Sequence, residues 1–318
     1  MDEASIRLSV LAVALMLDRW LGEPDWLWSR LPHPVVLLGR IVAQADDGER
    51  RSRSAVFARG LLLIAVLALV AWAVGLTVDA LAHVTGPLAL LFECALVAIL
   101  LAQRSLIEHV LAVEQGLERS VDEGRRALSM IVGRVTDQLD PSEVRRAALE
   151  SLAENAADGI VAPVFWYLLG GLPGIVFYKA VNTADSMIGH RSERHEWLGK
   201  PAARLDDAMN WVPARLTALF FLALAGVREM RRRTATVVRD ARRHRSPNAG
   251  WPEAAAAVAL DLRFGGPRRY GTGMIDGAVL NAQGREQVSS ADLRRGVVLF
   301  SRVCWLLFAL AVLGFLVR

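Results

Sequence analysis

The chain contains only two cysteines, Cys94 and Cys304, and no Cys-x-x-Cys pair. Both lie inside apolar segments, where a lone cysteine usually serves as a small buried apolar residue. The sequence also lacks a Gly-x-x-x-x-Gly-Lys-Ser/Thr loop, a His-Glu-x-x-His helix and a Gly-x-Ser-x-Gly turn. These absences argue against a redox pair, a P-loop nucleotide site, a zinc hydrolase and a serine hydrolase of the common kinds.

Apolar residues, in contrast, are abundant. They make up 53% of the chain, and the mean hydropathy is +0.32, which is richer than a typical soluble protein. The excess lies in two nearly unbroken runs, residues 60–78 and 297–317, and a shorter run, residues 88–102, carries Glu93. Each long run can cross a hydrocarbon core of ~30 Å at a helical rise of ~1.5 Å per residue. The sequence therefore predicts an all-α, polytopic integral membrane protein in contact with membrane lipid.

Arginines crowd one connection, residues 228–250, and a second group precedes the first apolar run. The positive-inside rule places both connections on the cytoplasmic side. A nucleic-acid site is the alternative interpretation, but these arginines adjoin apolar segments and lack interleaved aromatic residues. We therefore expect no nucleic-acid partner. The two groups are Arg228, Arg231, Arg232, Arg233, Arg239, Arg242, Arg243 and Arg245, and Arg50, Arg51, Arg53 and Arg59.

The chain shows no internal repeat, so we expect one membrane-embedded helical domain over residues 1–318 with polar cytoplasmic inserts. One insert, at about 103–158, has an amphipathic helical pattern in which Asp140 is a predicted N-cap and Pro141 the first helical residue. The first apolar stretch, residues 8–17, has the length of a buried or re-entrant helix. The acidic start Met1-Asp2-Glu3 lacks the basic region of a signal peptide, so we expect the segment to be retained.

Two further apolar stretches, residues 160–181 and 212–227, decide the topology together. If both cross, the polar segment between them faces the periplasm; if neither crosses, it lies in the cytoplasm with the arginine-rich connection. The first stretch is interrupted by Pro163, by Gly170-Gly171 and by Pro173-Gly174, and the second is short. Broken helices are tolerated at membrane depth where they line a protein cavity. We therefore expect broken or re-entrant helices here, with neither stretch crossing.

Three acids, Glu150, Glu154 and Asp158, recur at every fourth position, so a helix would place them on one face. Arg146 is the only nearby basic residue that answers them at helical spacing. Unanswered carboxylates with the Asn155 amide are hard oxygen ligands, which suit a magnesium ion that carries nucleotide phosphates. The alternative is a solvated helix end.

Polar residues gather again on both sides of residue 200. Asn182 and Asp185 precede Arg191 in a segment that mixes amides, hydroxyls and a carboxylate, which is consistent with a polar hairpin lining a cavity. Further on, paired carboxylates stand between arginines; this pattern suits metal-nucleotide binding with phosphate clamping, or internal salt bridges that orient helices. The residues of the second group are Arg204, Asp206, Asp207 and Arg215.

Two isolated polar residues lie in turn-rich segments. Asn248 belongs to the turn Ser246-Pro247-Asn248, and His33 stands between two prolines that hold its backbone extended. A capping or packing role is the alternative for His33.

Taken together, these strings are similar to the CobD/CbiB family of cobalamin biosynthesis. The resemblance rests on Glu-Ser-Leu-Ala-Glu-Asn-Ala-Ala-Asp-Gly from Glu150, Asn-Thr-Ala-Asp-Ser-Met from Asn182, Ala-Arg-Leu-Asp-Asp from Ala203, Pro-Ala-Arg-Leu-Thr from Pro213 and Ser-Pro-Asn-Ala-Gly-Trp-Pro from Ser246. The opening Asp18, Gly22, Pro24, His33-Pro34-Val35 and Gly39 agrees as well, so the likeness runs from Asp18 to about Gly271. Two positions depart from the pattern: Glu23 replaces an aspartate, and Val135 replaces the acid of a Gly-Arg-Asp-Thr string.

The resemblance implies an ATP-dependent ligase of the cell inner membrane, with an active site on the cytoplasmic side. Its substrates would be ATP, adenosylcobyric acid and (R)-1-amino-2-propanol or its O-phosphate, with Mg²⁺ as the metal. Other late cobalamin-pathway membrane enzymes are expected partners. With this resemblance, we expect Glu154, Asp158, Asp206 and Asp207 to serve magnesium-ATP or general-base chemistry, with Glu154, Asp158 and Asp207 on the metal. The expected substrate-binding residues are His33, Glu150, Asn155, Asn182, Asp185, Arg191, Arg204, Arg215 and Asn248.

Two other functions remain as alternatives. A corrinoid transporter would use intramembrane charges such as Glu93 and would show inverted repeats, of which the sequence has none. A scaffold for nucleotide-loop assembly would show degraded polar motifs, whereas only position 135 has drifted.

Overall fold

The computed structural model describes residues 2–46, 52–189, 195–226, 230–270 and 273–318. Within these residues the fold is helical apart from four short strands, which confirms the all-α prediction. The chain forms two compact units. The first unit comprises Met1–Ala102, Ala162–Asn210 and Phe308–Arg318, and the second comprises Gln103–Val161 and Trp211–Leu307. The second unit begins where the sequence predicts the start of the helical insert.

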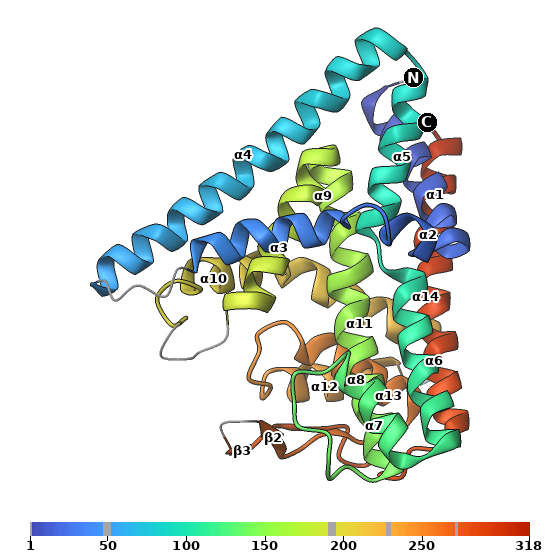
Figure 1. Cartoon of the computed structure of the whole chain (residues 1–318). Coiled ribbons are helices and arrows are strands. Elements are labelled where there is room, and N and C mark those ends of the chain that lie inside the picture. The colour runs from blue at the N-terminus through green and yellow to red at the C-terminus, as the bar shows by residue number, and fades with distance from the viewer. Residues whose placement is uncertain (1, 47–51, 190–194, 227–229, 271–272) are drawn as a thin grey trace. The chain divides into compact units, whose positions relative to one another are not determined.

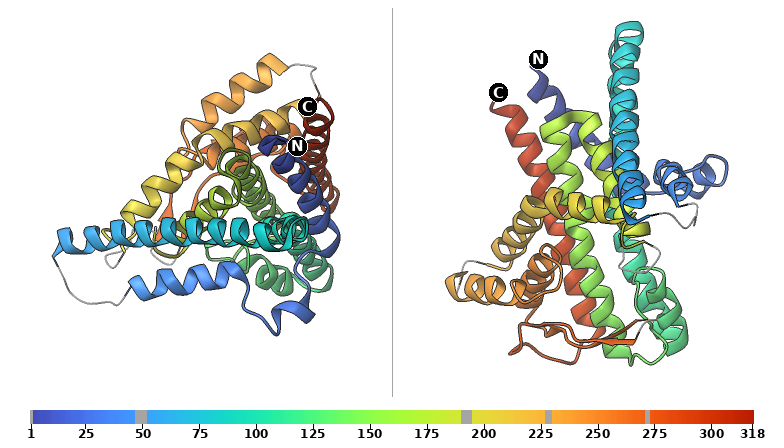
Figure 2. Two further views of the ribbon diagram at one scale, coloured as in Figure 1. Left: turned by 90° about the horizontal axis from the view of Figure 1, so that it is seen from above. Right: turned by 90° about the vertical axis from the view of Figure 1, so that its left-hand side faces the viewer.

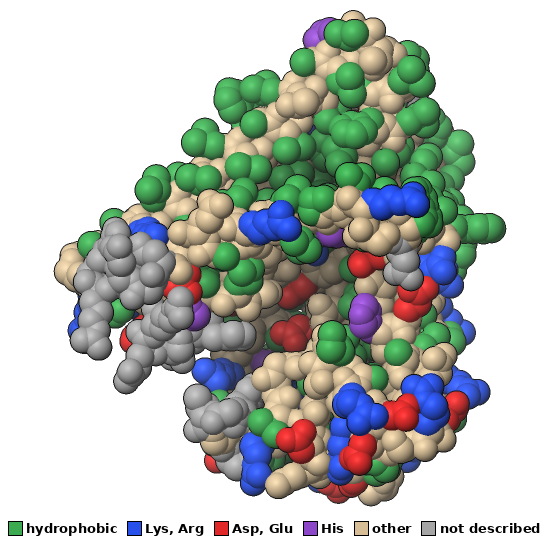
Figure 3. Space-filling view, viewed as in Figure 1, with side chains coloured by type: hydrophobic (Ala, Val, Ile, Leu, Met, Phe, Trp, Pro, Cys, Tyr) green, Lys and Arg blue, Asp and Glu red, His purple; other side chains and the backbone are tan. Residues whose placement is uncertain are grey.

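The first unit contains the long apolar helix Arg53–Thr85 (Figure 1). Hydrophobic side chains cover the outer surface of its fourth and fifth helices in Figure 3. Leu62, Trp72 and Leu91 on these two helices are at least 60% exposed. Such a surface needs lipid rather than water around it. The helices are α1 (Glu3–Leu21), α2 (Asp25–Trp28), α3 (Pro34–Ala45), α4 (Arg53–Thr85), α5 (Leu88–Leu100), α9 (Ala162–Ile188) and α10 (Lys200–Met209).

Four helical runs among the described residues are long and apolar enough to cross a membrane: Arg53–Thr85, Leu88–Arg119, Pro141–Ile188 and Ser290–Leu316. They confirm a multi-pass membrane protein and include all three spans predicted from hydropathy. The run that contains residues 160–181 is one of them, whereas Trp211–Leu224 is a shorter apolar helix. Our preference for neither stretch crossing therefore stays a prediction.

Helix α9 is broken, as its glycines and prolines predict. Gly171 adopts φ 59° and ψ −151°, a left-handed conformation that favours glycine, and Pro173 follows inside the helix. The break frees carbonyl oxygens at the end of the first half. Arg7 of α1 donates hydrogen bonds of 3.0 Å to the carbonyls of Leu168 and Leu169, and it also pairs with Glu3. A side chain from another helix thus satisfies the freed backbone groups.

The core of the first unit lies where α3, α4, α9 and α10 meet. Gly75 on α4 faces Pro173, so close that an added Cβ would come within 2.4 Å of the proline ring. The two chain ends also lie side by side (Figure 2), with Arg318 3.2 Å from Asp2. The buried residues at the meeting of the four helices are Leu38, Val42, Leu63, Leu67, Ala180, Ala184, Ile188, Leu198 and Ala202.

The second unit packs helices around α8 (Pro141–Ala156) and α13 (Gly250–Leu260). Helix α8 begins with a capping box between Asp140 and Glu143, with Pro141 at its start, so the predicted N-cap is confirmed. It ends in a π-helical turn, Ala157–Val161. Gly296 lets the last helix approach Leu149 of α8, since an added Cβ would lie 2.2 Å from that side chain. The other helices of the unit are α6 (Gln103–Arg119), α7 (Val121–Ser129), α11 (Trp211–Leu224), α12 (Met230–Ala241) and the start of α14 (Ser290–Leu316).

Two small antiparallel ribbons follow α13. Strand β1 (Phe264–Gly265) pairs with β4 (Val279–Leu280), and β2 (Arg268–Tyr270) pairs with β3 (Gly273–Ile275). The arginine-rich connection, expected as a loop, contains helix α12, while Arg228 lies outside the described residues. Asp240 on this helix accepts the backbone N–H of Asn281 at 2.8 Å, so the helix is fixed to the strand region.

Candidate functional site

Polar side chains form one cluster in each unit. The acidic cluster of the first unit consists of Asp185 on α9 and of Asp206 and Asp207 on α10. Asp206 is 8% exposed, and two amides hold its carboxylate: Asn182 donates to Oδ1 at 3.2 Å and Asn210 donates to Oδ2 at 3.1 Å. Helix α9 therefore supplies the amide of Asn182 and the carboxylate of Asp185. These residues are three positions apart, so they lie on neighbouring turns of one helix face.

A buried tyrosine supports this cluster. Tyr178 donates a hydrogen bond of 2.9 Å to the amide oxygen of Asn210, which fixes the amide so that its nitrogen faces Asp206. Met209, beside Asn210, lies in a small core with Ala162, Tyr178 and Val181. The carboxylate is thus held by a preorganised chain of side chains.

The electrostatics of Asp206 are unusual. Burial, followed by the negative charge of Asp185, raises the pKa of Asp206 to about 7, although the amides of Asn182 and Asn210 lower it. Burial also raises the pKa of Asp207. Like charges at a buried site favour protonation, or binding of a cation. The sequence placed Asp206 and Asp207 between arginines, but the two hydrogen bonds to Asp206 come from the amides of Asn182 and Asn210.

His33 lies in the same unit, at the N-cap of α3. Its Nδ1 accepts the N–H of Val35 at 3.2 Å, and its ring meets Trp28 edge to face at 4.5 Å. Burial lowers the pKa of His33, with Glu23 and Lys179 acting in opposite directions. The structure therefore gives His33 the capping role that we listed as the alternative, and its buried Nε2 has no hydrogen-bond partner.

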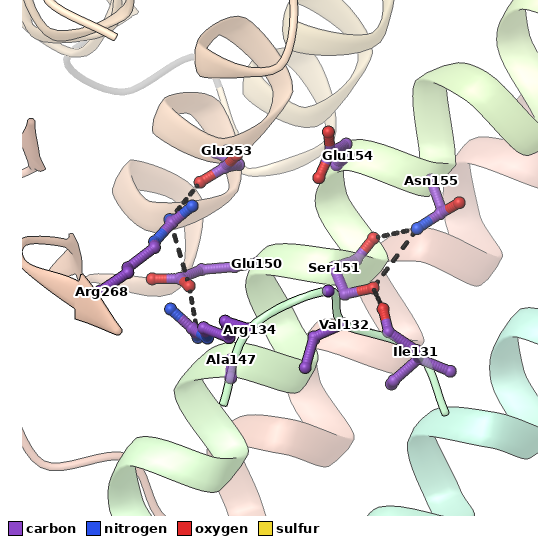
Figure 4. Close-up of a pocket in the computed structure, with 11 residues that line it drawn as sticks. Ile131, Val132, Arg134, Ala147, Glu150, Ser151, Glu154, Asn155, Glu253 and Arg268 are labelled. Atoms are coloured by element: carbon purple, nitrogen blue, oxygen red, sulfur yellow. Dashed lines mark hydrogen bonds and ion pairs between the residues drawn. The ribbon is translucent and has the colours of Figure 1, made fainter. Parts of the chain in front are cut away.

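The cluster of the second unit is a pocket of about 130 Å³, which we call the glutamate–arginine pocket (Figure 4). Helix α8 supplies one wall, the loop before it supplies a second, and α13 and β2 supply the rest. Two of its acids, Glu150 and Glu253, are ion-paired directly with arginines of the lining. The polar lining residues are Arg134, Glu150, Ser151, Glu154, Asn155, Glu253 and Arg268.

Glu150 corrects one inference from the sequence. We took it as answered only by Arg146, but Arg146 donates to the carbonyl of Glu286. Glu150 is instead paired with Arg134 at 2.8 Å and with Arg268 at 3.2 Å. Its other oxygen accepts the N–H of Gly265 at 2.7 Å. Glu150 is 4% exposed, and both of its carboxylate oxygens have partners. The sequence did not reveal the two arginines because neither lies on helix α8.

Glu253 is the second buried acid of the pocket and was not predicted. It is 1% exposed, lies 2.9 Å from Arg268 and lies 3.6 Å from His244. Burial raises its pKa although Arg268 and His244 oppose this. Arg134, Arg268 and Glu253 were all missed. Arg134 belongs to the Gly-Arg string compared with the family pattern, Glu253 directly follows the Ser-Pro-Asn-Ala-Gly-Trp-Pro string, and Arg268 follows the Gly-Gly-Pro turn. Their position in or beside these strings was the available signal.

Glu154 and Asn155 also line this pocket. Glu154 is exposed, while the Asn155 amide nitrogen donates to the carbonyl of Ser151 at 2.9 Å. Asp158 does not line the pocket: it belongs to the π-helical turn, where the spacing of the α-helix no longer holds. The predicted face of three acids is therefore brought together for Glu150 and Glu154 only.

Arg215 and Asn248 lie together in the second unit. The guanidinium of Arg215 lies between the rings of Trp211 and Trp251, at 4.2 Å and 4.6 Å, and donates to the Asn248 side-chain oxygen at 3.4 Å. Burial lowers the pKa of Arg215. In the first unit, Arg204 is exposed on α10, and Arg191 lies outside the described residues.

Magnesium can be tested against these donors. Among the described residues, no group of three or more His, Cys, Asp or Glu side chains could hold a metal ion. Mg²⁺, however, is usually held by one or two carboxylates together with substrate phosphates and water. The buried charge of Asp206 beside Asp185 is what a divalent cation would relieve. The acidic cluster therefore fits a magnesium ion that arrives with phosphates.

Known proteins are similar to this chain over almost its whole length. The family model described as CobD/CbiB protein matches residues 11–300. The chain is 47% identical over 320 residues to the cobalamin biosynthesis protein CobD of Brucella suis biovar 1 (strain 1330), with 98% of each chain covered. It is also 47% identical over 305 residues to the protein of that name from Rhizobium meliloti (strain 1021), with 93% of each covered. For the Rhodobacter capsulatus protein of that name the identity is 45% over 301 residues, covering 92% of this chain and 93% of the relative. No solved structure matches. The chain belongs to the CobD/CbiB family.

Proposed function

We propose that this chain acts in cobalamin biosynthesis as an ATP-dependent amide ligase of the inner membrane. It would join adenosylcobyric acid to (R)-1-amino-2-propanol or its O-phosphate. Its membership of the CobD/CbiB family, with relatives named for cobalamin biosynthesis, supports the pathway. The acidic cluster supports the reaction.

The reaction has two halves. In the first, an oxygen of the substrate carboxylate attacks the γ-phosphorus of ATP, so that a C–O–P link forms and ADP leaves. In the second, the amine nitrogen attacks the acyl carbon, so that the C–N bond forms, inorganic phosphate leaves and the nitrogen loses a proton. The first half concentrates negative charge, and the second needs a proton acceptor.

The acidic cluster suits the first half, and this is the observation on which the proposal rests. Asp185 and Asp207 would hold Mg²⁺, while Asp206, fixed by Asn182 and Asn210, adds negative charge behind them. A bound Mg²⁺ offsets the charge of the nucleotide phosphates. The protein's own part is to keep the carboxylates in place before ATP arrives.

The exposed carboxylate of Glu154 suits the second half, as acceptor of the amine proton. Arg204 and Arg215 remain candidates for holding phosphates or the substrate carboxylate. We place the active site on the cytoplasmic side, where ATP is available.

Ligation by the detergent-solubilised full chain tests the proposal. Adenosylcobyric acid, ATP, Mg²⁺ and each amine should give the amide product with one ADP per product. Asp207→Asn should abolish or strongly reduce the rate, while Asp122→Asn, on a side chain 75% exposed in the second unit, should not. Folded wild-type protein that forms no product with either amine would contradict the ligase function. A wild-type rate in folded Asp207→Asn would remove that residue from the mechanism.

A further inference from the structure

The segment between α1 and α4 carries an exposed apolar surface that the proposed reaction does not use. Trp26 of α2 is 66% exposed, Leu31 in the following turn is 56% exposed, and Val36 and Leu37 of α3 are 50% and 43% exposed. Large apolar side chains gathered in this way mark a surface that a partner or a lipid covers. We call it the tryptophan–arginine face: Trp26, Leu31, Val36 and Leu37, together with the exposed Arg30 and Arg40.

Helix α3 shows why these side chains point outward. Leu38 and Val42, one turn apart, are buried in the core of the first unit with residues of α9. Val36 and Arg40 are also one turn apart, so they lie together on another side of the helix. Helix α3 thus has one apolar side in the protein core and a second side on which an exposed apolar end adjoins a basic residue. That second pattern is typical of a helix that lies in the plane of a membrane surface.

The level of this face follows from α1. Asp2 lies 3.2 Å from Arg318 at the end of the apolar helix α14, and Gly314 of that helix is so close to Leu8 that an added Cβ would come within 3.3 Å of the leucine side chain. Helix α1 has 19 residues, so it is about 28 Å long, close to a hydrocarbon core of ~30 Å. Its far end carries Trp20, which is 69% exposed, and α2 and α3 follow there, with α3 crosswise to α1 (Figure 1). The face therefore lies about one hydrocarbon thickness from the end of α14, at the level of a headgroup layer.

The chemistry of the face matches an anionic headgroup layer. Tryptophan is enriched at membrane–water interfaces, where its ring contacts apolar chains and its N–H reaches polar groups. Arginine binds phosphate oxygens through its planar fork of donors. Residues 26–45 contain Arg30 and Arg40 and no acid, so their charge is positive. Helix α3 leads toward the arginine group of residues 50–59, which we expect on the cytoplasmic side, and the cytoplasmic leaflet carries anionic phospholipids.

We infer that the tryptophan–arginine face lies in the headgroup layer of the bilayer and binds anionic phospholipid, with Arg30 and Arg40 on the lipid phosphates. The inference does not depend on the ligase reaction. It has a consequence for the acidic cluster, because α3 packs against α9, where an added Cβ on Gly39 would come within 3.3 Å of the Met187 sulfur. Asp185 lies two residues before Met187 on the same helix. Phospholipid bound at the face thus holds this part of α9 at a fixed depth.

A depth measurement tests the position of the face. The full chain with Trp26→Cys is labelled with a fluorophore and reconstituted in vesicles; Cys94 and Cys304 are buried and should react little. Phospholipid with a nitroxide near its headgroup should quench the label more strongly than phospholipid with the nitroxide near the chain end. Arg126→Cys, on a side chain 72% exposed in the second unit, is the matched control and should be quenched by neither. Leu31→Cys takes the place of Trp26→Cys if that variant fails to fold. Quenching by neither lipid would mean that water or another protein, such as a second copy of this chain, covers the face, and it would overturn the inference; so would stronger quenching from the chain end.

The choice between lipids tests the charge. In the same vesicles, nitroxide-labelled phosphatidylglycerol should quench the label at position 26 with an apparent affinity at least about fivefold higher than that of nitroxide-labelled phosphatidylcholine, since one arginine near a membrane surface contributes a factor of that order. Arg30→Gln combined with Arg40→Gln should remove the preference and leave the depth of the label unchanged, whereas Arg126→Gln should keep the preference. Equal affinity for the two lipids without these substitutions, or a preference that survives the double substitution, would overturn the assignment of anionic phospholipid to this face.

Discussion

Arg134 and Glu150 form an ion pair of 2.8 Å that joins a loop to helix α8. Only 13% of the Arg134 side chain and 6% of the Glu150 side chain are exposed. The pair does not stand alone. Arg268 shares the same carboxylate oxygen, so one acid balances two guanidinium groups. Removing this acid would leave two buried cations with fewer acceptors.

Glu150→Gln should therefore destabilise the chain by about 3 kcal/mol or more, which is the usual cost of breaking a buried ion pair from one side. Thermal or denaturant unfolding of the detergent-solubilised protein measures the change. Glu118→Gln is the control, since that residue faces Arg294 in a pair with 67% and 58% of the side chains exposed, and should cost under about 1 kcal/mol. Equal costs for the two variants would show that the buried pair contributes no more than an exposed one.

Asp206 should make the stability of the chain depend on pH. Its pKa rises from 3.8 to about 7 on folding, so the folded state binds a proton more tightly than the unfolded state does. The free energy of unfolding should then fall as pH rises from about 4 to about 7 and level off above that. Asp206→Asn should flatten this part of the profile, and Mg²⁺ should raise the unfolding temperature of the wild type at pH 8 more than at pH 5. Parallel profiles for the variant and the wild type would mean that Asp206 titrates normally.

The contact between α4 and α9 should tolerate no added side-chain atom at Gly75. Gly75→Ala would place a methyl group within 2.4 Å of the Pro173 ring, and overpacking of this kind costs about 1–3 kcal/mol. Gly170→Ala is the matched control, because an added Cβ there meets nothing within 4 Å. Unfolding temperatures of both variants in one detergent give the comparison, and a Gly75→Ala protein as stable as Gly170→Ala would show that the helices move apart at little cost.

The features that the sequence predicted are those with local causes. Hydropathy is a property of a continuous run, so the spans within α4, α5 and α14 were visible. The start of α8 was equally local, because Asp140, Pro141 and Glu143 cap the helix with residues of its first turn. The break at Gly171 was foreseen from the glycine pair and the following proline.

The pairing of charges, in contrast, was not predictable. Glu150 lies near Arg146 in sequence, yet its partners come from a loop and from β2. Similarly, Asp206 was expected beside arginines but is held by the amides of Asn182 and Asn210. Helical spacing describes neighbours along one helix and carries no information on what a second segment brings. The shift in register at the π-helical turn, which separates Asp158 from Glu154, has no sequence signal that we recognise.

The break in α9 also bears on the order in which this chain is made. Arg7 leaves the ribosome 161 residues before Leu168, whose carbonyl it finally binds. Throughout that interval the guanidinium has Glu3, one turn away on the same helix, as an early partner. Arg7 can therefore pair with Glu3 before α9 is present. The hydrogen bond from Arg7 to the carbonyl of Leu168 requires α9. The contact that closes the break therefore joins two helices whose bonded residues are separated by 161 residues of chain.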